Sequence, residues 1–192
     1  DFCEDTRLLE ALLPRLIDEE KSALVDFLSA IDTGIKDIDY DDSEKEVIFT
    51  TYHKGKDGEL YPLNLFFESE GTIKSIMLFI YARTAILHNK SIFVDELNIK
   101  LHPLLLKFII DLFYENKSQA QLIYTTHDTT LLDKKFFRRD QIWFVQKDEY
   151  GYSELSALSD FKVRSDASFE KDYLAGVYGG IPFLKEFRVK EG

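Results

Sequence analysis

The stretch Ser91-Ile92-Phe93-Val94-Asp95-Glu96 decides the fold, because a short run with three large apolar residues leads straight into two adjacent carboxylates. Such a run is typical of a strand buried on both faces of a parallel sheet. The charges then belong at the carboxyl end of the strand, where open α/β sheets bind their ligands. Two readings stay open for the acidic pair: a site that holds Mg²⁺ and takes a proton from water, or a strand end that turns acidic on reaching solvent.

The segments on either side of this stretch alternate between helix and strand. A helix is predicted over 72–88 before it, and another over 104–116 after it, with Pro103 in its first turn. A second apolar strand follows at 121–126. This βα alternation favours a parallel sheet covered by helices.

The remaining elements are predicted to flank that sheet. Residues 6–30 have the spacing of a helix with one apolar face, divided or kinked at Pro14. A hairpin is expected before Ser69, with arms at 47–52 and 60–67, and another after residue 140, with arms at 141–146 and 153–158. A short helix is expected around 129–134. We therefore predict a single α/β domain over 1–192, with a largely parallel central sheet flanked by helices and with antiparallel hairpins.

The composition supports a folded globular domain. The chain has 192 residues, a net charge of −11, 45% hydrophobic residues and 14% aromatic residues. That aromatic content excludes a disordered acidic chain, and the acidic balance argues against a surface that generally coats nucleic acid. Much of the acidity lies in residues 37–46, which we interpret as a solvated turn in preference to a metal site, because no His or Cys joins it.

The sequence favours the cytoplasm and gives no sign of a membrane. Cys3 is the only cysteine, so a disulfide framework is excluded and a reducing compartment is expected. No apolar run approaches the roughly 20 residues that span a bilayer, and the acidic N-terminus does not resemble a signal peptide. The chain begins with Asp1 rather than Met, so we expect an excised or processed piece.

A second candidate site lies at Ser69-Glu70-Gly71-Thr72, where a helix begins. Gly71 allows the backbone to come close to a ligand, and a phosphate would meet the free N–H groups of the helix together with the hydroxyls of Ser69 and Thr72. The alternative is an ordinary helix cap, in which Ser69 or Thr72 accepts hydrogen bonds from the first turn.

A third candidate is His127, which follows Tyr124-Thr125-Thr126 at the end of a strand. Its imidazole can donate a hydrogen bond to a phosphoryl group in transfer. The alternative is a surface histidine, with Asp128 capping the next helix.

In this order, the three sites resemble the carboxyl-terminal half of an ABC-type AAA-family ATPase, of the overcoming-lysogenization-defect and abortive-infection type, related to SMC head domains. Ser69-Glu70-Gly71-Thr72 stands where that family has its signature motif, and Ile92 to Glu96 matches Walker B. Further matches are Leu101-His102-Pro103 to the D-loop region, Tyr124 to His127 to the switch-histidine strand, and 160–164 and 178–182 to the family's ending. The resemblance covers roughly residues 20–185.

The resemblance implies ATP and Mg²⁺ as cofactors. It implies that Asp95 orders the Mg²⁺ shell, Glu96 polarises the attacking water and His127 contacts the γ-phosphate. Ser69 and Gly71, with Thr72 beside them, would reach the nucleotide held by a second subunit. The implied assembly is a homodimer that sandwiches ATP.

Two features depart from the family pattern. The phosphate-cradling G-x-x-x-x-G-K-[ST] loop is absent from the sequence, where the only Gly-Lys pair is Gly55-Lys56. We therefore expect an N-terminal lobe with that loop as the partner of this chain, and no ATP turnover by these 192 residues alone. The second departure is Glu70, because a carboxylate near a triphosphate is unfavourable unless it points away.

Two rival functions remain. A non-catalytic assembly or regulatory module would explain the missing loop, but it has no need of Asp95, Glu96 and His127. A nuclease reading rests on the spacing of Arg83 and His88, which is known from small all-helical ribonucleases and fits this α/β chain poorly; no G-x-S-x-G elbow supports a serine hydrolase. By resemblance, the biological role is phage defence or DNA transactions with a nuclease partner, and contact with nucleic acid is left open.

Overall fold

The computed structural model describes residues 2–43, 46–115, 117–164 and 167–181. The chain divides into two compact units, Asp1–His127 and Asp128–Gly192. The expectation of one domain stays a prediction. Among the described residues, no helix combines the length and the apolar character that crossing a membrane requires.

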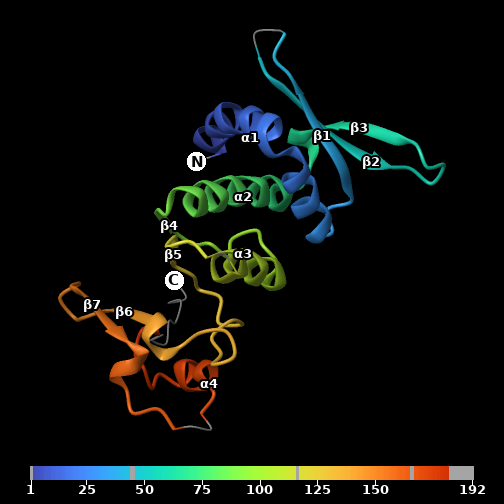
Figure 1. Ribbon diagram of the computed structural model, residues 1–192. Coiled ribbons are helices and arrows are strands. Elements are labelled where there is room, and N and C mark those ends of the chain that lie inside the picture. The colour runs from blue at the N-terminus through green and yellow to red at the C-terminus, as the bar shows by residue number, and fades with distance from the viewer. Residues whose placement is uncertain (1, 44–45, 116, 165–166, 182–192) are drawn as a thin grey trace, which may run out of the picture. The chain divides into compact units, whose positions relative to one another are not determined.

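The first unit begins with the long helix α1 (Phe2–Ala30), which packs against both β1 (Ile35–Asp41) and α2 (Glu70–His88) (Figure 1). Its kink lies at Glu20, whose φ of −141° is not helical, whereas Pro14 lies inside the helix. At the kink, Glu20 Oε2 accepts a hydrogen bond from Arg83 Nε of α2 at 2.8 Å, and it forms an ion pair with Arg83 Nη2 at 2.6 Å. The kink is therefore associated with an ion pair between helices rather than with proline.

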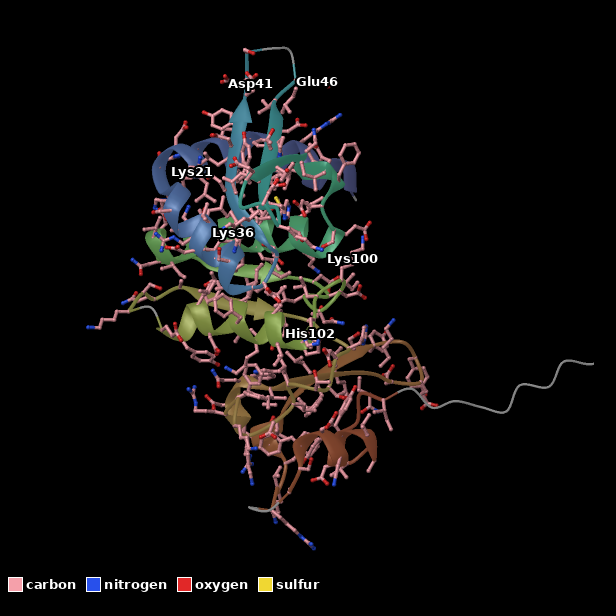
Figure 2. The ribbon with its side chains drawn as sticks, turned by 90° about the vertical axis from the view of Figure 1, so that its right-hand side faces the viewer. Lys21, Lys36, Asp41, Glu46, Lys100 and His102 are labelled. Carbon is pink, nitrogen blue, oxygen red and sulfur yellow. The ribbon has the colours of Figure 1, made fainter. Side chains whose placement is uncertain are left out.

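Three antiparallel strands follow, β1 (Ile35–Asp41), β2 (Ile48–Lys54) and β3 (Leu60–Asn64). The expectation of a solvated turn over 37–46 is wrong for its first half, which is the body of β1. A register irregularity between Ile35 and Asp37 turns both Ile35 and Ile38 inward, where both are fully buried. This irregularity breaks the period-two pattern that would have revealed the strand. In Figure 2, Asp41 and Glu46 lie beside the tip of the β1–β2 hairpin.

A hydrogen-bonded cluster connects this sheet to the start of the next helix. Glu68 precedes α2 (Glu70–His88), and its Oε1 lies 2.6 Å from both Thr51 Oγ1 and His53 Nε2 of β2. Thr51 is fully buried, and the Glu68 side chain is nearly so. A buried carboxylate needs such partners, so the turn before α2 is fixed to the sheet.

The parallel sheet of the first unit is smaller than predicted. Within the described residues it consists of β4 (Ser91–Val94) and β5 (Gln121–Tyr124), paired in parallel with Val94 opposite Tyr124. The prediction of burial on both faces is also wrong, because Phe93 is 76% exposed and Ile123 44% exposed. The α/β class is confirmed, but the sheet is not largely parallel in the described chain.

Helix α3 (Pro103–Glu115) is buried on one side only. Leu106, Ile109 and Ile110 are buried, whereas Leu104 is 74% exposed. An aromatic group joins the three long helices, since Phe27 of α1 stacks on Phe79 of α2 at 4.5 Å and lies 5.9 Å from Phe108 of α3.

The second unit is built on an antiparallel hairpin, as expected. Strand β6 (Trp143–Lys147) pairs with β7 (Ser153–Ala157), and single 3₁₀ turns (Arg139–Gln141 and Leu158–Asp160) flank them. Residues 129–134 form turns instead of the predicted short helix. The last described helix is α4 (Phe169–Leu174), and the part of the predicted ending from 182 onward lies outside the described residues.

Aromatic stacking forms the core of this unit. Phe144 of β6 stacks on both Tyr173 and Tyr178, each at 5.3 Å between ring centroids. The Tyr178 hydroxyl donates to Asp172 Oδ2 at 3.0 Å. Burial, reinforced by this hydrogen bond to a carboxylate, raises the pKa of Tyr178 to about 12.

The contrast between two neighbouring residues of β2 gives a test of the first unit's core. Phe49 is fully buried and Ile48 is 47% exposed. We expect Phe49→Ala to lower the free energy of unfolding by about 3–5 kcal/mol and Ile48→Ala by less than about 1 kcal/mol. Urea denaturation of the two variants measures both values, and equal losses would contradict this packing.

The raised pKa of Tyr178 predicts loss of stability in strong base. The unfolded phenol loses its proton near pH 10 and the folded phenol near pH 12, so the stabilisation is present below pH 10 and is lost between these values. We expect wild-type protein to lose on the order of 1–2 kcal/mol more than Tyr178→Phe between pH 9 and pH 11.5. Urea unfolding midpoints at both pH values measure the difference, and parallel losses would show that Tyr178 is not the group responsible.

Candidate functional site

Asp95 and Glu96 follow β4 directly, at the carboxyl end of the parallel pair. The register places them beside Thr125 and Thr126, which follow β5. The Thr125 hydroxyl donates to Asp95 Oδ1 and accepts from the backbone N–H of Glu96, whose nitrogen lies 2.8 Å away. One threonine hydroxyl therefore orients both acidic residues.

The backbone completes this connection between the two strands. Leu97 N–H donates to the Thr125 carbonyl at 3.0 Å, and the Thr126 hydroxyl donates to Asn98 Oδ1 at 2.8 Å. The Leu97 side chain is fully buried and anchors the loop. The loop after β4 is thus held against the loop after β5 at several points.

His127 joins the acidic pair. Its Nε2 lies 3.8 Å from Glu96 Oε1, and the His127 side chain is 88% exposed while that of Glu96 is 45% exposed. An exposed pair at this distance forms a weak ion pair at most, and only when the imidazole is protonated. Both groups consequently face solvent and can meet a ligand without first being uncovered.

The donor set suits a weakly held hard cation. Among the residues that the structure describes, no group of three or more His, Cys, Asp or Glu side chains forms a metal cage. One oxygen of Asp95 accepts from Thr125, and Oδ2 has no hydrogen bond within the described chain. A single carboxylate of this kind fits Mg²⁺, which keeps several waters and takes further ligands from substrate phosphates.

The candidate signature residues form a separate group at the start of α2. Ser69 is the N-cap: its Oγ accepts from Thr72 N–H at 3.1 Å and lies 2.8 Å from Thr72 Oγ1. This arrangement is the ordinary helix cap, which was the alternative to a phosphate site on the sequence alone. The Glu70 carboxylate forms an ion pair with Lys100 at 2.8 Å, so its negative charge faces the lysine ammonium group.

Gly71 has a packing role that the sequence did not reveal. A Cβ atom at this position would lie 2.8 Å from the carbonyl oxygen of Lys100, which is too close for any side chain. The structure therefore brings Asp95, Glu96 and His127 together, and connects them to Ser69, Gly71 and Thr72 through the loop that contains Lys100.

Thr125 and Lys74 are the site residues that sequence reasoning missed. The signal for Thr125 was available, because pairing the two predicted strands at their carboxyl ends places it opposite Asp95. Nothing in the sequence indicated Lys74, whose Nζ donates to the carbonyl oxygens of Ile99 at 2.8 Å and Glu96 at 3.3 Å.

Comparison with solved structures supports the fold. One structure, from work on "Structural biochemistry of ATP-driven dimerization and DNA stimulated activation of SMC ATPases", aligns with a TM-score of 0.58 over 88% of this chain and 96% of that chain. The identity is 12%, so the likeness concerns the fold alone. A search of curated protein sequences finds no match.

Comparison with family models gives a direct match. The model described as "AAA domain, putative AbiEii toxin, Type IV TA system" matches residues 5–133, well over half of the chain. This family match indicates a nucleotide-binding ATPase function. The chain belongs to this family of AAA domains.

Proposed function

We propose that the chain supplies the Walker B, switch-histidine and signature parts of a Mg²⁺-dependent ATP hydrolase that works as a nucleotide-sandwich dimer. The observation that carries the proposal is the meeting of Glu96 and His127, 3.8 Å apart, beside the oriented carboxylate of Asp95. All three lie at the carboxyl end of parallel strands, where α/β folds place their chemistry.

In this proposal Asp95 holds the Mg²⁺ and Glu96 acts on the attacking water. When bound, Mg²⁺ would offset the negative charge that develops on the phosphate oxygens. Thr125 keeps Asp95 in place through its hydroxyl, and it also fixes the peptide of Glu96. Glu96 accepts a hydrogen bond from water and takes its proton as the water oxygen bonds to the γ-phosphorus. The bond between that phosphorus and the β–γ bridging oxygen breaks, and ADP leaves.

His127 contacts the γ-phosphate, and its exposure and position next to Glu96 support that role. Ser69, Gly71 and Thr72 bind the nucleotide of the second subunit through the start of α2, where free N–H groups favour anions. The Glu70–Lys100 ion pair reduces repulsion between the Glu70 carboxylate and a triphosphate.

A phosphate-binding loop must come from another segment, because the sequence contains no G-x-x-x-x-G-K-[ST] motif. We infer that an N-terminal lobe of the same protein provides it. The open face of the parallel strands supports this inference, since parallel sheets are normally covered on both faces and Phe93 and Ile123 are not. Burying a side chain such as Phe93 stabilises an interface by about 1.5–3 kcal/mol.

The cellular role is proposed from analogy. The matched family's description includes a toxin of a type IV toxin–antitoxin system, and the SMC work concerns DNA-stimulated activation. Phage defence or a DNA transaction in the cytoplasm, with a nuclease partner, fits both. A non-catalytic assembly module is the second candidate, and the missing phosphate loop is the observation that favours it.

Replacing Glu96 with Gln separates the two candidates. In the complete ATPase that carries the phosphate loop, we expect Glu96→Gln to lower kcat by at least about 100-fold and to leave ATP bound, because the amide cannot take a proton. Steady-state phosphate release and retention of labelled ATP measure these effects. Glu154→Gln, on the exposed side of β7, is the matched control and should change neither. Unaltered turnover in Glu96→Gln would favour the assembly module.

The missing loop predicts weak nucleotide binding by the isolated chain. Without a cradle for the β- and γ-phosphates, we expect isothermal titration of the 192 residues with Mg-ATP to give a dissociation constant of about 1 mM or weaker, and no ATP turnover. The complete protein, titrated in the same buffer, is the control. A micromolar affinity of the isolated chain would show that it contains a triphosphate site of its own.

A further inference from the structure

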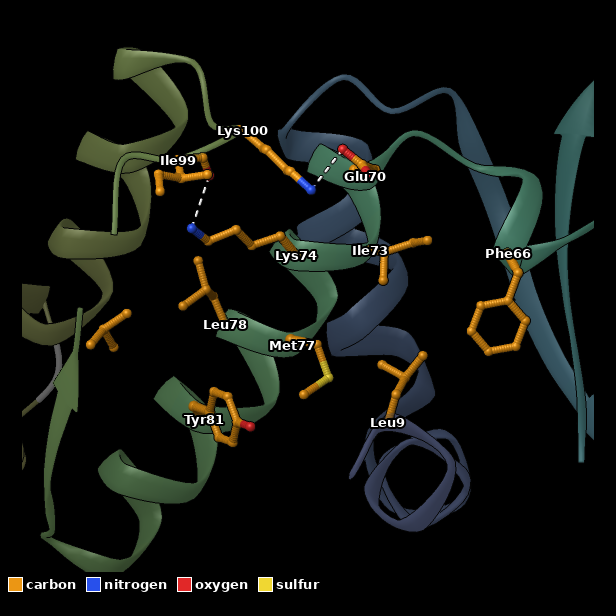
Figure 3. A pocket seen from close by; sticks show the side chains of 11 residues that line it. Leu9, Phe66, Glu70, Ile73, Lys74, Met77, Leu78, Tyr81, Ile99 and Lys100 are labelled. Carbon is orange, nitrogen blue, oxygen red and sulfur yellow. Dashed lines mark hydrogen bonds and ion pairs between the residues drawn. The ribbon is translucent and has the colours of Figure 1, made fainter. Parts of the chain in front are cut away.

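The loop between β4 and α3 is attached to α2 by a lysine that the proposed chemistry does not use. Lys74 reaches from α2 into this loop, where Nζ donates to the carbonyl oxygen of Ile99 at 2.8 Å (Figure 3). The same Nζ donates to the carbonyl oxygen of Glu96 at 3.3 Å. The half-buried side chain lines a pocket of about 280 Å³ together with apolar residues that include Met77, Leu78 and Val94. Hydrogen bonds from a charged donor are stronger than those between neutral groups.

The same loop lies directly on the first turn of α2. The Lys100 carbonyl approaches Gly71 so closely that a Cβ atom would lie 2.8 Å from the oxygen. Glu96 and Lys100, near the two ends of the loop, have φ values of +48° and +62°. Residues other than glycine disfavour this conformation, so the loop must be held in it by its surroundings.

Contacts hold the loop from two sides. On one side, Thr125 and Thr126 bind the backbone of Glu96 and Leu97 and the side chain of Asn98. On the other side, Lys74 binds the carbonyl of the same Glu96 residue whose N–H binds Thr125. The backbone of Glu96 is therefore fixed at both its N–H and its C=O.

We propose that Lys74 is a positioning residue, which fixes the Glu96 backbone and makes the start of α2 and the 96–100 loop move as one body. The proposal rests on the proposed function, in that Glu96 is taken as the water-activating residue. It adds a physical connection between two half-sites. A nucleotide that pulls on Ser69 and Gly71 of one subunit displaces α2, and Lys74 transmits this displacement to the Glu96 of the same subunit.

Hydrogen–deuterium exchange on the 192-residue chain tests the connection without any ATPase activity. Lys74→Met keeps the unbranched apolar stem and removes the donors. We expect the Leu97, Ile99 and Leu101 amides, which all donate within or next to the loop, to exchange at least about tenfold faster, while β5 amides stay within about twofold. Lys74→Arg keeps a donor and should restore most of the protection.

A matched control lies on the same part of the helix. Glu70→Gln breaks the Glu70–Lys100 ion pair, whose side chains are largely exposed, and should leave loop exchange within about twofold of wild type. If Lys74→Met lowers the thermal midpoint of the whole chain, Gly71→Ala provides the second test. The added methyl group pushes on the Lys100 carbonyl while Lys74 is intact, so exchange of the same amides should become faster.

In the complete ATPase, Lys74→Met should lower kcat about tenfold and leave the KM for Mg-ATP within about twofold, because it disturbs the orientation of Glu96 and not the phosphate cradle. Unchanged loop exchange in Lys74→Met, or Lys74→Arg behaving like Lys74→Met, would overturn the positioning role. A wild-type assembly without ATP turnover would instead overturn the proposed function, and the exchange data would still decide whether Lys74 holds the loop.

Discussion

The parallel register of β4 and β5 is the constraint on which the site depends. With Val94 opposite Tyr124, the next residues along the two strands are Asp95 and Thr125, at the same edge of the sheet. A slip of one residue would turn every side chain of one strand to the other face. The Thr125 hydroxyl would then lose Asp95 and the N–H of Glu96 together. The four residues of each strand are few, so the hydrogen bonds of the loops beyond them contribute to fixing this register.

One face of these two strands is open among the described residues. Phe93 and Ile123 project from the face that a second layer normally covers in a parallel sheet. The other face is already covered, and an aromatic group that includes Phe27 and Phe79 joins its helices. An apolar face beside a carboxylate edge is what a phosphate-binding lobe would need, since docking there would bring its loop to the same edge as Asp95 and Glu96.

The order of elements from α2 to β5 was predictable, because helical and strand periodicities are distinct in this region and Pro103 marks the start of α3. The candidate residues were also identifiable, since each follows a strand or opens a helix. Burial was not. Local pattern could not show that β4 has one open face, because an apolar strand has the same sequence whether or not its second layer is present. Long-range contacts account for the rest: the irregularity that buries Ile35 with Ile38, the kink at Glu20 opposite Arg83, and the reach of Lys74 all depend on partners far along the chain.

The conformation of Glu96 connects stability with function. A left-handed φ costs a residue with a side chain on the order of 1–2 kcal/mol, and glycine at the same position would avoid that cost. The surroundings offset it with the hydrogen bonds from Lys74 and to Thr125 at the two ends of the same residue. A structure that needed only a turn here would be more stable with glycine. Glu96 retains a strained backbone and a half-exposed carboxylate 3.8 Å from His127, so the strain is better explained by what the carboxylate does than by how the loop folds.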